Sequence, residues 1–117
     1  MDSRILSLLL DSWSKPVVFV DTTHHIRYMN VPAGRHYSKW GDVIGKSIFD
    51  CHKSTSREVI EAAYQDLVDG RKEVLIVSSR KHRVYMRAVR DIDGTLIGYY
   101  ERYDAPLPAT TIEEGMP

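Results

Sequence analysis

The sequence predicts an α+β fold in which helices cover one face of a five-stranded antiparallel sheet. Two strand-like segments come first, a helical middle follows, and three more strand-like segments come after it. Turn-forming residues join the first two strands and the last two, as in antiparallel hairpins. Helices inserted after the second strand would cover one face and leave the other to an N-terminal helix or a partner.

A short amphipathic helix is predicted within the N-terminal unit, residues 1–13. Ile5, Leu8 and Leu9 recur at helical spacing, and Pro16 ends the pattern. The apolar run is too short to cross a bilayer, and no cleavage site for export follows it. We therefore expect no membrane insertion and a cytoplasmic location.

The first hairpin follows this helix. Residues 17–20 are β-branched or aromatic, residues 21–25 form a turn-like run, and residues 26–29 alternate between apolar and polar. His24 and His25 fall in the turn, where no third metal ligand stands at a useful spacing. We expect both imidazoles to face solvent.

The middle of the chain predicts short helical turns and then one longer helix. The turns cover residues 32–40 and 43–49. The longer helix begins at a cap among residues 54–56, and Gly70 ends it. Its apolar residues make one stripe, which is typical of a helix that packs on a sheet.

Three strands are expected after the long helix. They cover residues 73–78, 83–90 and 96–103. Residues 91–94, with the sequence Asp-Ile-Asp-Gly, indicate a hairpin turn between the last two. From Ala105 onward the periodic pattern ends, so residues 105–117 are predicted to be a flexible tail or linker.

Composition and motifs exclude several function classes. With 16 basic and 16 acidic residues, the chain has no net charge to attract nucleic acid or an anionic membrane. Its single cysteine, Cys51, excludes an internal disulfide framework and a multi-cysteine metal site. The sequence has no glycine-rich phosphate loop, no Gly-x-Ser-x-Gly elbow and no paired carboxylates beside a base. We expect a binding module and not an enzyme.

Three segments, in this order and at this spacing, resemble a PAS sensor domain. They are PVVFVDTTHHIRYMN at residues 16–30, VIGKSIFD at residues 43–50 and YMRAVRDIDGTLIGYYERYD at residues 85–104. The resemblance implies a PAS domain over residues 14–104, a sheet with the spatial order 2-1-5-4-3, and ligand sensing or protein association. The middle of the chain is similar to a PAS subgroup found beside hemerythrin-like domains, although two prolines of that subgroup's Cys-His-Pro-Pro-Lys-Ser motif are missing here.

A ligand pocket between sheet and helices is one hypothesis that the residues support. Strand parity and helical spacing direct six side chains toward such a pocket: Tyr28, Asn30, Phe49, Tyr64, Met86 and Ala88. The hydroxyls of Tyr28 and Tyr64 would orient a polar group of the ligand. A filled core would use the same residues, so the sequence leaves both alternatives open.

The cofactor stays unidentified at this point. Flavin photosensors of the LOV type need a cysteine just after the glycine that Gly45 resembles, and residues 46–49 contain none, so flavin is not expected. Haem-binding PAS domains ligate iron through a histidine, and Cys51 with His52 is the best candidate for a haem contact. Adjacent Cys and His at a helix entrance also pack or cap, so haem is one alternative among several.

Two functions from different classes remain. In the first, the protein is a sensory module in signal transduction or transcriptional regulation, which binds a small molecule and relays the signal through dimerisation. In the second, it is a ligand-free dimerisation or docking domain. The sequence contains no kinase, cyclase or helix-turn-helix segment, so we expect a signalling partner or output domain on another chain or on a removed segment.

A homodimer is predicted through the N-terminal helix. A helix of about ten residues is marginal in water alone, so its apolar side chains need a covering surface. These side chains are Ile5, Leu8, Leu9 and Trp13. The outer face of the sheet is expected to be apolar too, and a second subunit would complete the cover. The residues expected on that face are Tyr85, Val89, Tyr99 and Tyr103.

Overall fold

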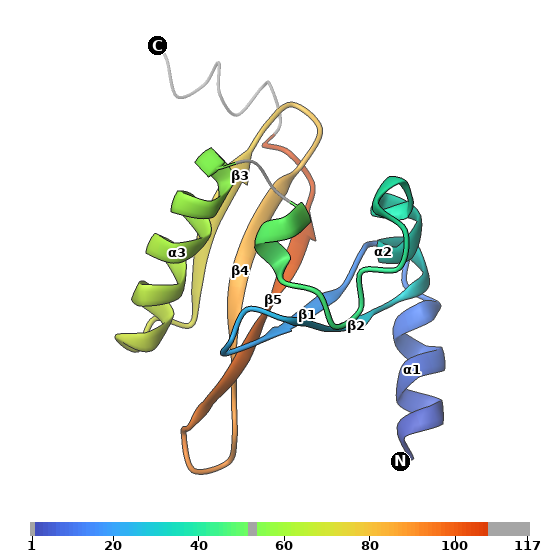
Figure 1. The fold of residues 1–117 in the computed structure, drawn as a ribbon, viewed down its shortest axis with the longest axis horizontal. Helices are drawn as coiled ribbons and strands as arrows, with labels where there is room; N and C mark the ends of the chain where they lie inside the picture. Colours follow the sequence, from blue (N-terminus) through green and yellow to red (C-terminus); the bar gives the residue numbers. More distant parts are fainter. Residues whose placement is uncertain (1, 52–53, 108–117) are drawn as a thin grey trace.

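The computed structural model describes residues 2–51 and 54–107, and it confirms the α+β fold. Its five strands form one antiparallel sheet in the spatial order β2-β1-β5-β4-β3, as the resemblance implied (Figure 1). The elements in chain order are α1 (Ser3–Asp11), β1 (Val18–Asp21), β2 (Ile26–Met29), α2 (Val31–His36), η1 (Ser38–Trp40), η2 (Ile48–Cys51), α3 (Ser54–Val68), β3 (Glu73–Ser78), β4 (Arg83–Arg90) and β5 (Leu96–Asp104). In this part of the chain, no helix is long and apolar enough to cross a membrane.

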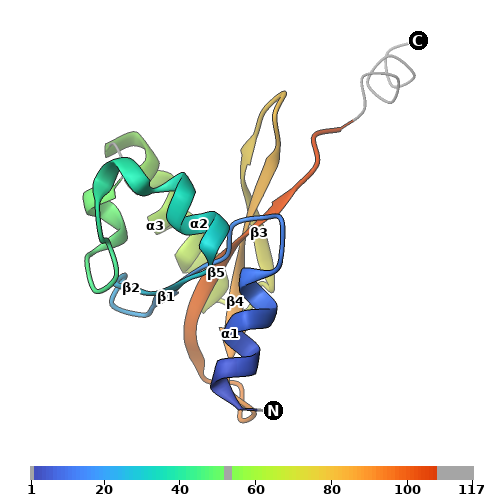
Figure 2. The same ribbon diagram turned by 90° about the vertical axis from the view of Figure 1, so that its right-hand side faces the viewer.

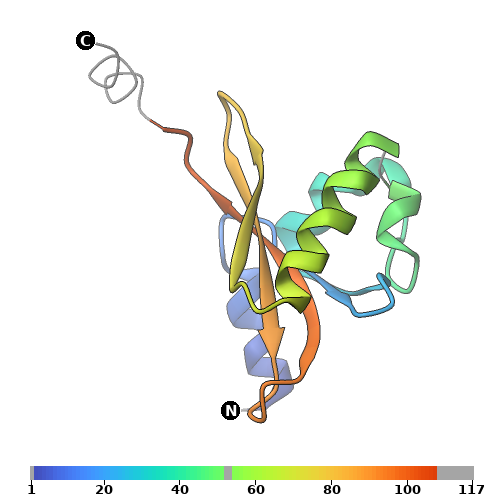
Figure 3. The same cartoon turned by 90° about the vertical axis from the view of Figure 1, so that its left-hand side faces the viewer.

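Helix α3 covers one face of the sheet, which we call the inner face. It packs against β3 and β4, and Figure 3 shows it beside these strands. Gly70 follows the helix in a left-handed conformation (φ 113°), as predicted for a residue that ends a helix. The buried core beneath the helices contains Val18, Val20, Ile26, Ala33, Tyr37, Val43, Ile48, Ile60, Ala63, Leu67, Met86 and Tyr99.

A bulge in the first hairpin turns Tyr28 away from the inner face. Phe19 pairs with Tyr28, but the next residue, Val20, pairs with Ile26, so Arg27 is an extra residue on β2. Ile26 is therefore buried in the core, whereas Tyr28 lies with Phe19 on the opposite, outer face. The expectation that Tyr28 points toward the helix-covered face was wrong because it assumed unbroken alternation along the strand.

The outer face carries a charged network beside Tyr85 and Val89, two of the four residues predicted for that face. The register of β5 with β4 and β1 places Tyr99 and Tyr103 on the inner face, so their assignment to the outer face was wrong. The outer face instead holds Glu73, whose carboxylate lies 3.3 Å from the guanidinium groups of Arg87 and Arg102. Both parities of the last strand contain aromatic residues, so its sequence did not distinguish the two faces.

Helix α1 stands on the side of the sheet opposite α3 (Figures 1 and 2). It ends at Asp11, two residues before the predicted end, and none of its residues is buried. Ile5, Leu8 and Leu9, together with Trp13 just beyond the helix, are each about half exposed. The apolar stripe of α1 is therefore uncovered in the single chain.

Candidate functional site

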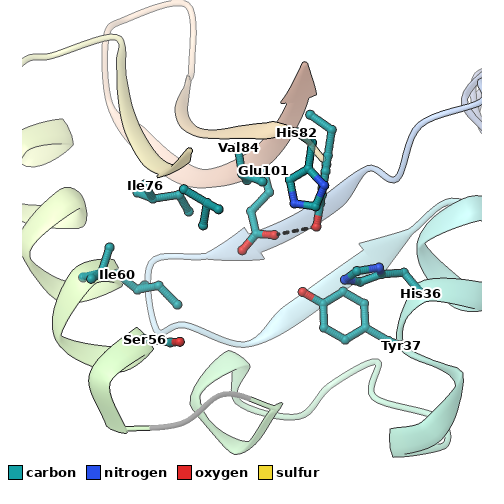
Figure 4. Close-up of a pocket in the computed structure, with 11 residues that line it drawn as sticks. His36, Tyr37, Ser56, Ile60, Ile76, His82, Val84 and Glu101 are labelled. Atoms are coloured by element: carbon teal, nitrogen blue, oxygen red, sulfur yellow. Dashed lines mark hydrogen bonds between the residues drawn. The ribbon is translucent and has the colours of Figure 1, made fainter. Parts of the chain in front are cut away.

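A cavity of about 330 Å³ lies between α3, the end of α2 and the inner face of β3, β4 and β5 (Figure 4). This volume falls at the lower end of the range for small-molecule sites. The described residues that line the cavity are His36, Tyr37, Ser56, Val59, Ile60, Ile76, Val77, His82, Val84, Glu101 and Tyr103. Part of this lining is polar and part is apolar.

The polar part of the cavity contains Glu101, whose carboxylate is on the inner face of β5. Glu101 is only 5% exposed, and its neighbours across the sheet are Met86 on β4 and Val18 on β1. The hydroxyl of Tyr103 donates a hydrogen bond of 3.4 Å to Oε2 of Glu101, drawn as a dashed line in Figure 4. Burying a carboxylate among apolar residues is costly unless polar groups surround it. Glu101 is therefore the chemically distinctive group of this cavity.

Two imidazole rings lie beside the ring of Tyr103. Its ring centroid lies 5.4 Å from that of His82 and 6.0 Å from that of His36, and the ring of Tyr37 lies 5.0 Å from that of His36. Burial raises the pKa of Tyr103, and the negative charge of Glu101 raises it further. The phenol therefore stays protonated at neutral pH and keeps its ability to donate a hydrogen bond.

The apolar part of the cavity comes from three elements. Helix α3 contributes Val59 and Ile60, and β4 contributes Val84. A bulge in β3 brings two adjacent residues, Ile76 and Val77, to the same lining. These side chains offer only hydrocarbon contacts, so this part of the cavity suits an apolar group.

The six residues predicted to line a pocket lie outside the lining of this cavity. Tyr28 is on the outer face, where its hydroxyl lies 3.4 Å from the carboxylate of Asp11. Met86 is fully buried, and the residues packed against the same core include Phe49, Tyr64 and Ala88. Contact of these side chains with a ligand stays a prediction.

The sixth residue, Asn30, is buried, and its side chain connects α1, β1 and α2 through hydrogen bonds. Its Oδ1 accepts hydrogen bonds from the backbone N–H groups of Val17 (2.8 Å) and Ala33 (3.1 Å). Its Nδ2 donates to the backbone carbonyls of Leu10 (2.9 Å) and Lys15 (3.0 Å). Both lone pairs and both protons of the amide are thus used within the chain. Asn30 holds the end of α1 in place.

Phe49 and Tyr64 meet around His24, which was expected to face solvent. The imidazole centroid lies 5.0 Å from the ring of Phe49 and 4.6 Å from that of Tyr64, and Nδ1 is 2.8 Å from the hydroxyl of Tyr99. The carbonyl of His24 accepts a hydrogen bond from the N–H of Ile48, so a later segment covers the turn. The expectation was wrong for His24 because this long-range contact is invisible in the local sequence.

The electrostatics of His24 reflect its position among the rings. Burial lowers the pKa of its imidazole below the ordinary value of 6.5, and the charges of Glu61 and Asp21 only partly oppose this effect. His24 also has a left-handed backbone (φ 65°), which is uncommon for a residue other than glycine. A neutral imidazole thus bridges the hairpin turn and the core.

The candidate haem contact at Cys51 and His52 lies outside the side chains that the structure describes. Its assignment to haem stays a prediction from the sequence. Among the described residues, no three His, Cys, Asp or Glu side chains are placed together to hold a metal ion.

The sequence-based prediction did not include Glu101, although the two-residue alternation of side chains along a strand could have indicated it. Tyr99, Glu101 and Tyr103 alternate along the last strand and share one face. The prediction placed Tyr99 and Tyr103 on the outer face, and Glu101 has the same parity along the strand. Glu101 was therefore not among the predicted pocket residues. An acidic residue between two aromatic residues on a helix-covered face is the signal of a polar site.

Residues 6–103 match the family described as PAS domain. No curated protein sequence matches the chain closely enough to suggest a relative. The family match therefore identifies the type of domain, and the solved structures add information on its fold.

Several solved structures share the fold. One is the C-terminal domain of a protein from Streptococcus mutans, with a TM-score of 0.74 and 18% identity over 97% of this chain and 90% of that chain. Another is the PAS domain of BvgS from Bordetella pertussis, with a TM-score of 0.64 and 17% identity over 97% and 92% of the two chains. A third is an RNA-binding Light-Oxygen-Voltage receptor, with a TM-score of 0.60 and 16% identity over 95% and 34%. At these identities the likeness establishes the fold alone.

Proposed function

Because the chain belongs to the PAS domain family, a family of sensory and signalling modules, we propose that it binds a small molecule in the cavity around Glu101. Binding would then be relayed through a dimer formed by α1. The observation that carries the proposal is the cavity itself, which combines a buried carboxylate and hydroxyls with a hydrocarbon wall. Small-molecule sites are typically mostly apolar with a few polar groups that orient the ligand.

Helix α2 supplies a route from the cavity to α1. Its last residue, His36, lines the cavity together with Tyr37. Its N-cap is Asn30, whose amide bonds the carbonyl of Leu10 near the end of α1. Since α2 is only six residues long, a ligand that displaces one end of it also acts on the other. This route supports a sensor in which ligand binding changes how α1 is held.

A second copy of this chain is the partner that α1 fits best. Ile5, Leu8 and Leu9 are about half exposed, and a nine-residue helix is marginal in water unless its apolar face is covered. A two-fold contact would bring Leu9 close to its own mate, so each apolar residue would be used twice. The charged outer face of the sheet favours the helix as the centre of this contact.

The dimer can be tested by one charged substitution. Leu9→Glu is expected to turn a dimer into a folded monomer, because the carboxylate would be buried against its mate. The control is Ile92→Glu, at a fully exposed apolar residue in the β4–β5 turn, which should leave the dimer intact. Light scattering at tens of micromolar measures both masses. A monomeric wild-type protein, or a dimeric Leu9→Glu variant, would contradict this part of the proposal.

Ligand binding is tested by native mass spectrometry of the protein purified from its own source. The wild-type chain is expected to carry added mass that denaturation releases. Ile76→Phe places a larger ring in the cavity and should abolish this mass, whereas Ile97→Phe, at a half-exposed residue of β5 outside the cavity lining, should retain it. Wild-type protein without added mass would favour the alternative function.

The alternative is a ligand-free dimerisation or docking domain. The packing of Phe49, Tyr64 and Tyr99 around His24 favours it, since much of the inner face is filled by the chain's own side chains. In either case we propose a binding module without a catalytic reaction, whose output depends on a signalling partner or on a domain of another chain.

A further inference from the structure

We infer that the free edge of β3 binds an extended acidic peptide of a partner protein, which adds a strand to the sheet. This inference goes beyond the proposed function, because it requires neither a ligand in the cavity nor a dimer through α1. It rests on three features of β3: its unpaired backbone edge, its exposed apolar side chains and the cations on both sides of it.

Strand β3 has one backbone edge without a partner strand. It is the last strand at its end of the sheet and pairs with β4 alone among the described strands. The N–H of Ala88 donates to the carbonyl of Lys72, and bonded and non-bonded pairs alternate along an antiparallel ladder. The register therefore directs the backbone N–H and C=O groups of Glu73 and Leu75 away from β4. An extended peptide can form hydrogen bonds with both residues.

Two apolar side chains of β3 are exposed beside this edge. Leu75 is 47% exposed and Val77 is 41% exposed. A bulge at Ile76 separates them, so the regular part of the edge is residues 73–75, and β3 contains no proline that would block pairing. Side chains of an added strand would lie next to those of β3 and cover this hydrocarbon.

Four exposed cations flank the strand, two on each side: Arg71, Lys72, Arg80 and Lys81. None of them forms an ion pair with another residue that the structure describes. The carboxylate of Glu73, the acidic residue within β3, is already paired with Arg87 and Arg102. Positive charge is therefore available at both ends of the edge, and it attracts acidic residues.

The turn between β3 and β4 holds two of these cations in a defined loop. Oγ of Ser79 accepts hydrogen bonds from the backbone N–H groups of Lys81 (3.2 Å) and His82 (3.3 Å). The N–H of Ser79 donates to the carbonyl of His82 at 3.0 Å. A loop that is fixed in this way loses less conformational entropy on binding than a flexible one. Arg80 and Lys81 are its two central residues.

The same charges disfavour a second copy of this chain as the occupant. If two β3 strands paired antiparallel about a two-fold axis, the residues before the strand in one chain would lie opposite the residues after it in the other. Cations would then meet cations, and like charges that face each other across a strand pair are destabilising. A peptide with acidic residues at both ends avoids this repulsion and can still pair with the edge.

Three peptides of nine residues separate edge pairing from charge attraction. The probe is Glu-Glu-Val-Thr-Val-Thr-Val-Glu-Glu. The second peptide has two prolines in place of the central Thr-Val pair, which removes an N–H donor of each orientation, and the third has lysine in place of every glutamate. Each is titrated into the ¹⁵N-labelled full chain, and amide shifts of residues 71–81 report binding. We expect the probe to bind at least about tenfold more tightly than the proline peptide, because backbone hydrogen bonds are lost, and the lysine peptide not to bind.

Amide hydrogen exchange identifies the edge directly. The N–H groups of Glu73 and Leu75 should exchange at least about tenfold more slowly with saturating probe, because they become hydrogen-bonded. The N–H of Val74 is the internal control, since the register directs it toward β4. Its exchange rate should change less.

A charge-reversal variant tests the flanking cations. Arg80→Glu combined with Lys81→Glu replaces two attractions by two repulsions, so it should reduce probe affinity at least about tenfold. The control combines Lys15→Glu with Lys46→Glu, two exposed cations outside β3 and its flanks, and changes the net charge of the chain equally. At physiological salt, charges more than about 8 Å apart are largely screened, so the control should keep the affinity of the wild type.

The outcomes separate this inference from the proposed function. Equal affinity for the probe and the proline peptide overturns it, because charge alone would then explain binding. It is also overturned if no peptide binds, if the lysine peptide binds as tightly as the probe, if the probe leaves the exchange of Glu73 and Leu75 unchanged, or if the charge-reversal variant keeps its affinity. None of these results bears on the cavity or on the α1 dimer. Because the peptides are compared on the wild-type chain, a variant that fails to fold does not remove the test.

Discussion

Two regions with polar side chains lie on the inner face of β5. Side chains of the chain itself fill the first region, whereas the second contains a cavity. Around Tyr99, the rings of His24, Phe49 and Tyr64 close on one another with centroid distances of 4.6–5.8 Å. Two and four residues further along, Glu101 and Tyr103 line a cavity of about 330 Å³. The difference shows that strand parity selects a face but does not decide whether the neighbouring elements fill it.

The neighbours of each region explain the difference. The filled region is covered by the segment after the first hairpin, because the N–H of Ile48 bonds the carbonyl of His24 and places Phe49 beside the imidazole. The hollow region is bounded by the end of α2 and the first turns of α3, whose lining residues Ser56, Val59 and Ile60 leave space over β5. Packing stabilises the first region, and the second is available for binding.

The largest expected effect is a difference in stability between two tyrosine truncations. Tyr99→Ala should reduce the free energy of unfolding by about 3–5 kcal/mol, the usual cost of removing a large, fully buried ring. Tyr103→Ala should cost about half of that, because its ring already borders empty space. Urea unfolding of the two variants measures both values. Equal losses would show that the cavity is as tightly packed as the filled region.

A smaller effect is expected when a residue is enlarged in each region. Ile48→Phe adds volume at a fully buried site beside the filled region, so it should cost about 1–3 kcal/mol. Ile76→Phe adds the same volume next to the cavity and should stay within about 0.5 kcal/mol of the wild type. Thermal unfolding gives both differences. If Ile76→Phe is as costly as Ile48→Phe, the cavity has no room for a ligand.

Acidification should weaken the filled region through His24. Its pKa in the folded chain is lowered by burial, so below the ordinary value of 6.5 the unfolded chain binds the proton more readily. Stability is thus fully present above that pH and is lost as the pH falls below it, by less than about 1.4 kcal/mol per pH unit for one proton. His24→Asn tolerates the left-handed backbone and does not titrate, so its unfolding free energy should depend less on pH.

A neighbouring substitution controls for this pH effect. His25 contacts the hydroxyl of Thr23 at 2.9 Å and has no ring contact with Phe49 or Tyr64 among the described interactions. His25→Asn should therefore keep most of the pH dependence of the wild type, because burial is the largest cause of the lowered pKa of His24 and the charge of His25 is the smallest. A His24→Asn variant with the wild-type slope between pH 7 and pH 5 would show that another group causes the acid sensitivity.

The order of the elements could be predicted from the sequence, because strand and helix periodicities and turn residues are local signals. The site could not be predicted in the same way. One extra residue, Arg27, reverses the face of Tyr28, and the four bonds of Asn30 join segments up to twenty residues apart. His24 is covered by a segment that only the folded chain brings near. Each of these features depends on a long-range contact that periodicity does not encode.

The smallest expected effect compares the two tyrosine hydroxyls. Tyr99→Phe removes a hydrogen bond to His24 with a heavy-atom distance of 2.8 Å, and should cost about 0.5–1.5 kcal/mol. Tyr103→Phe removes a 3.4 Å contact with Glu101, which is at the long end for a hydrogen bond, and water entering the cavity can replace the hydroxyl. Its cost should stay below about 0.5 kcal/mol in denaturant unfolding. A larger loss for Tyr103→Phe than for Tyr99→Phe would mean that the hydroxyl of Tyr103 is the more strongly stabilising donor and that water does not replace it.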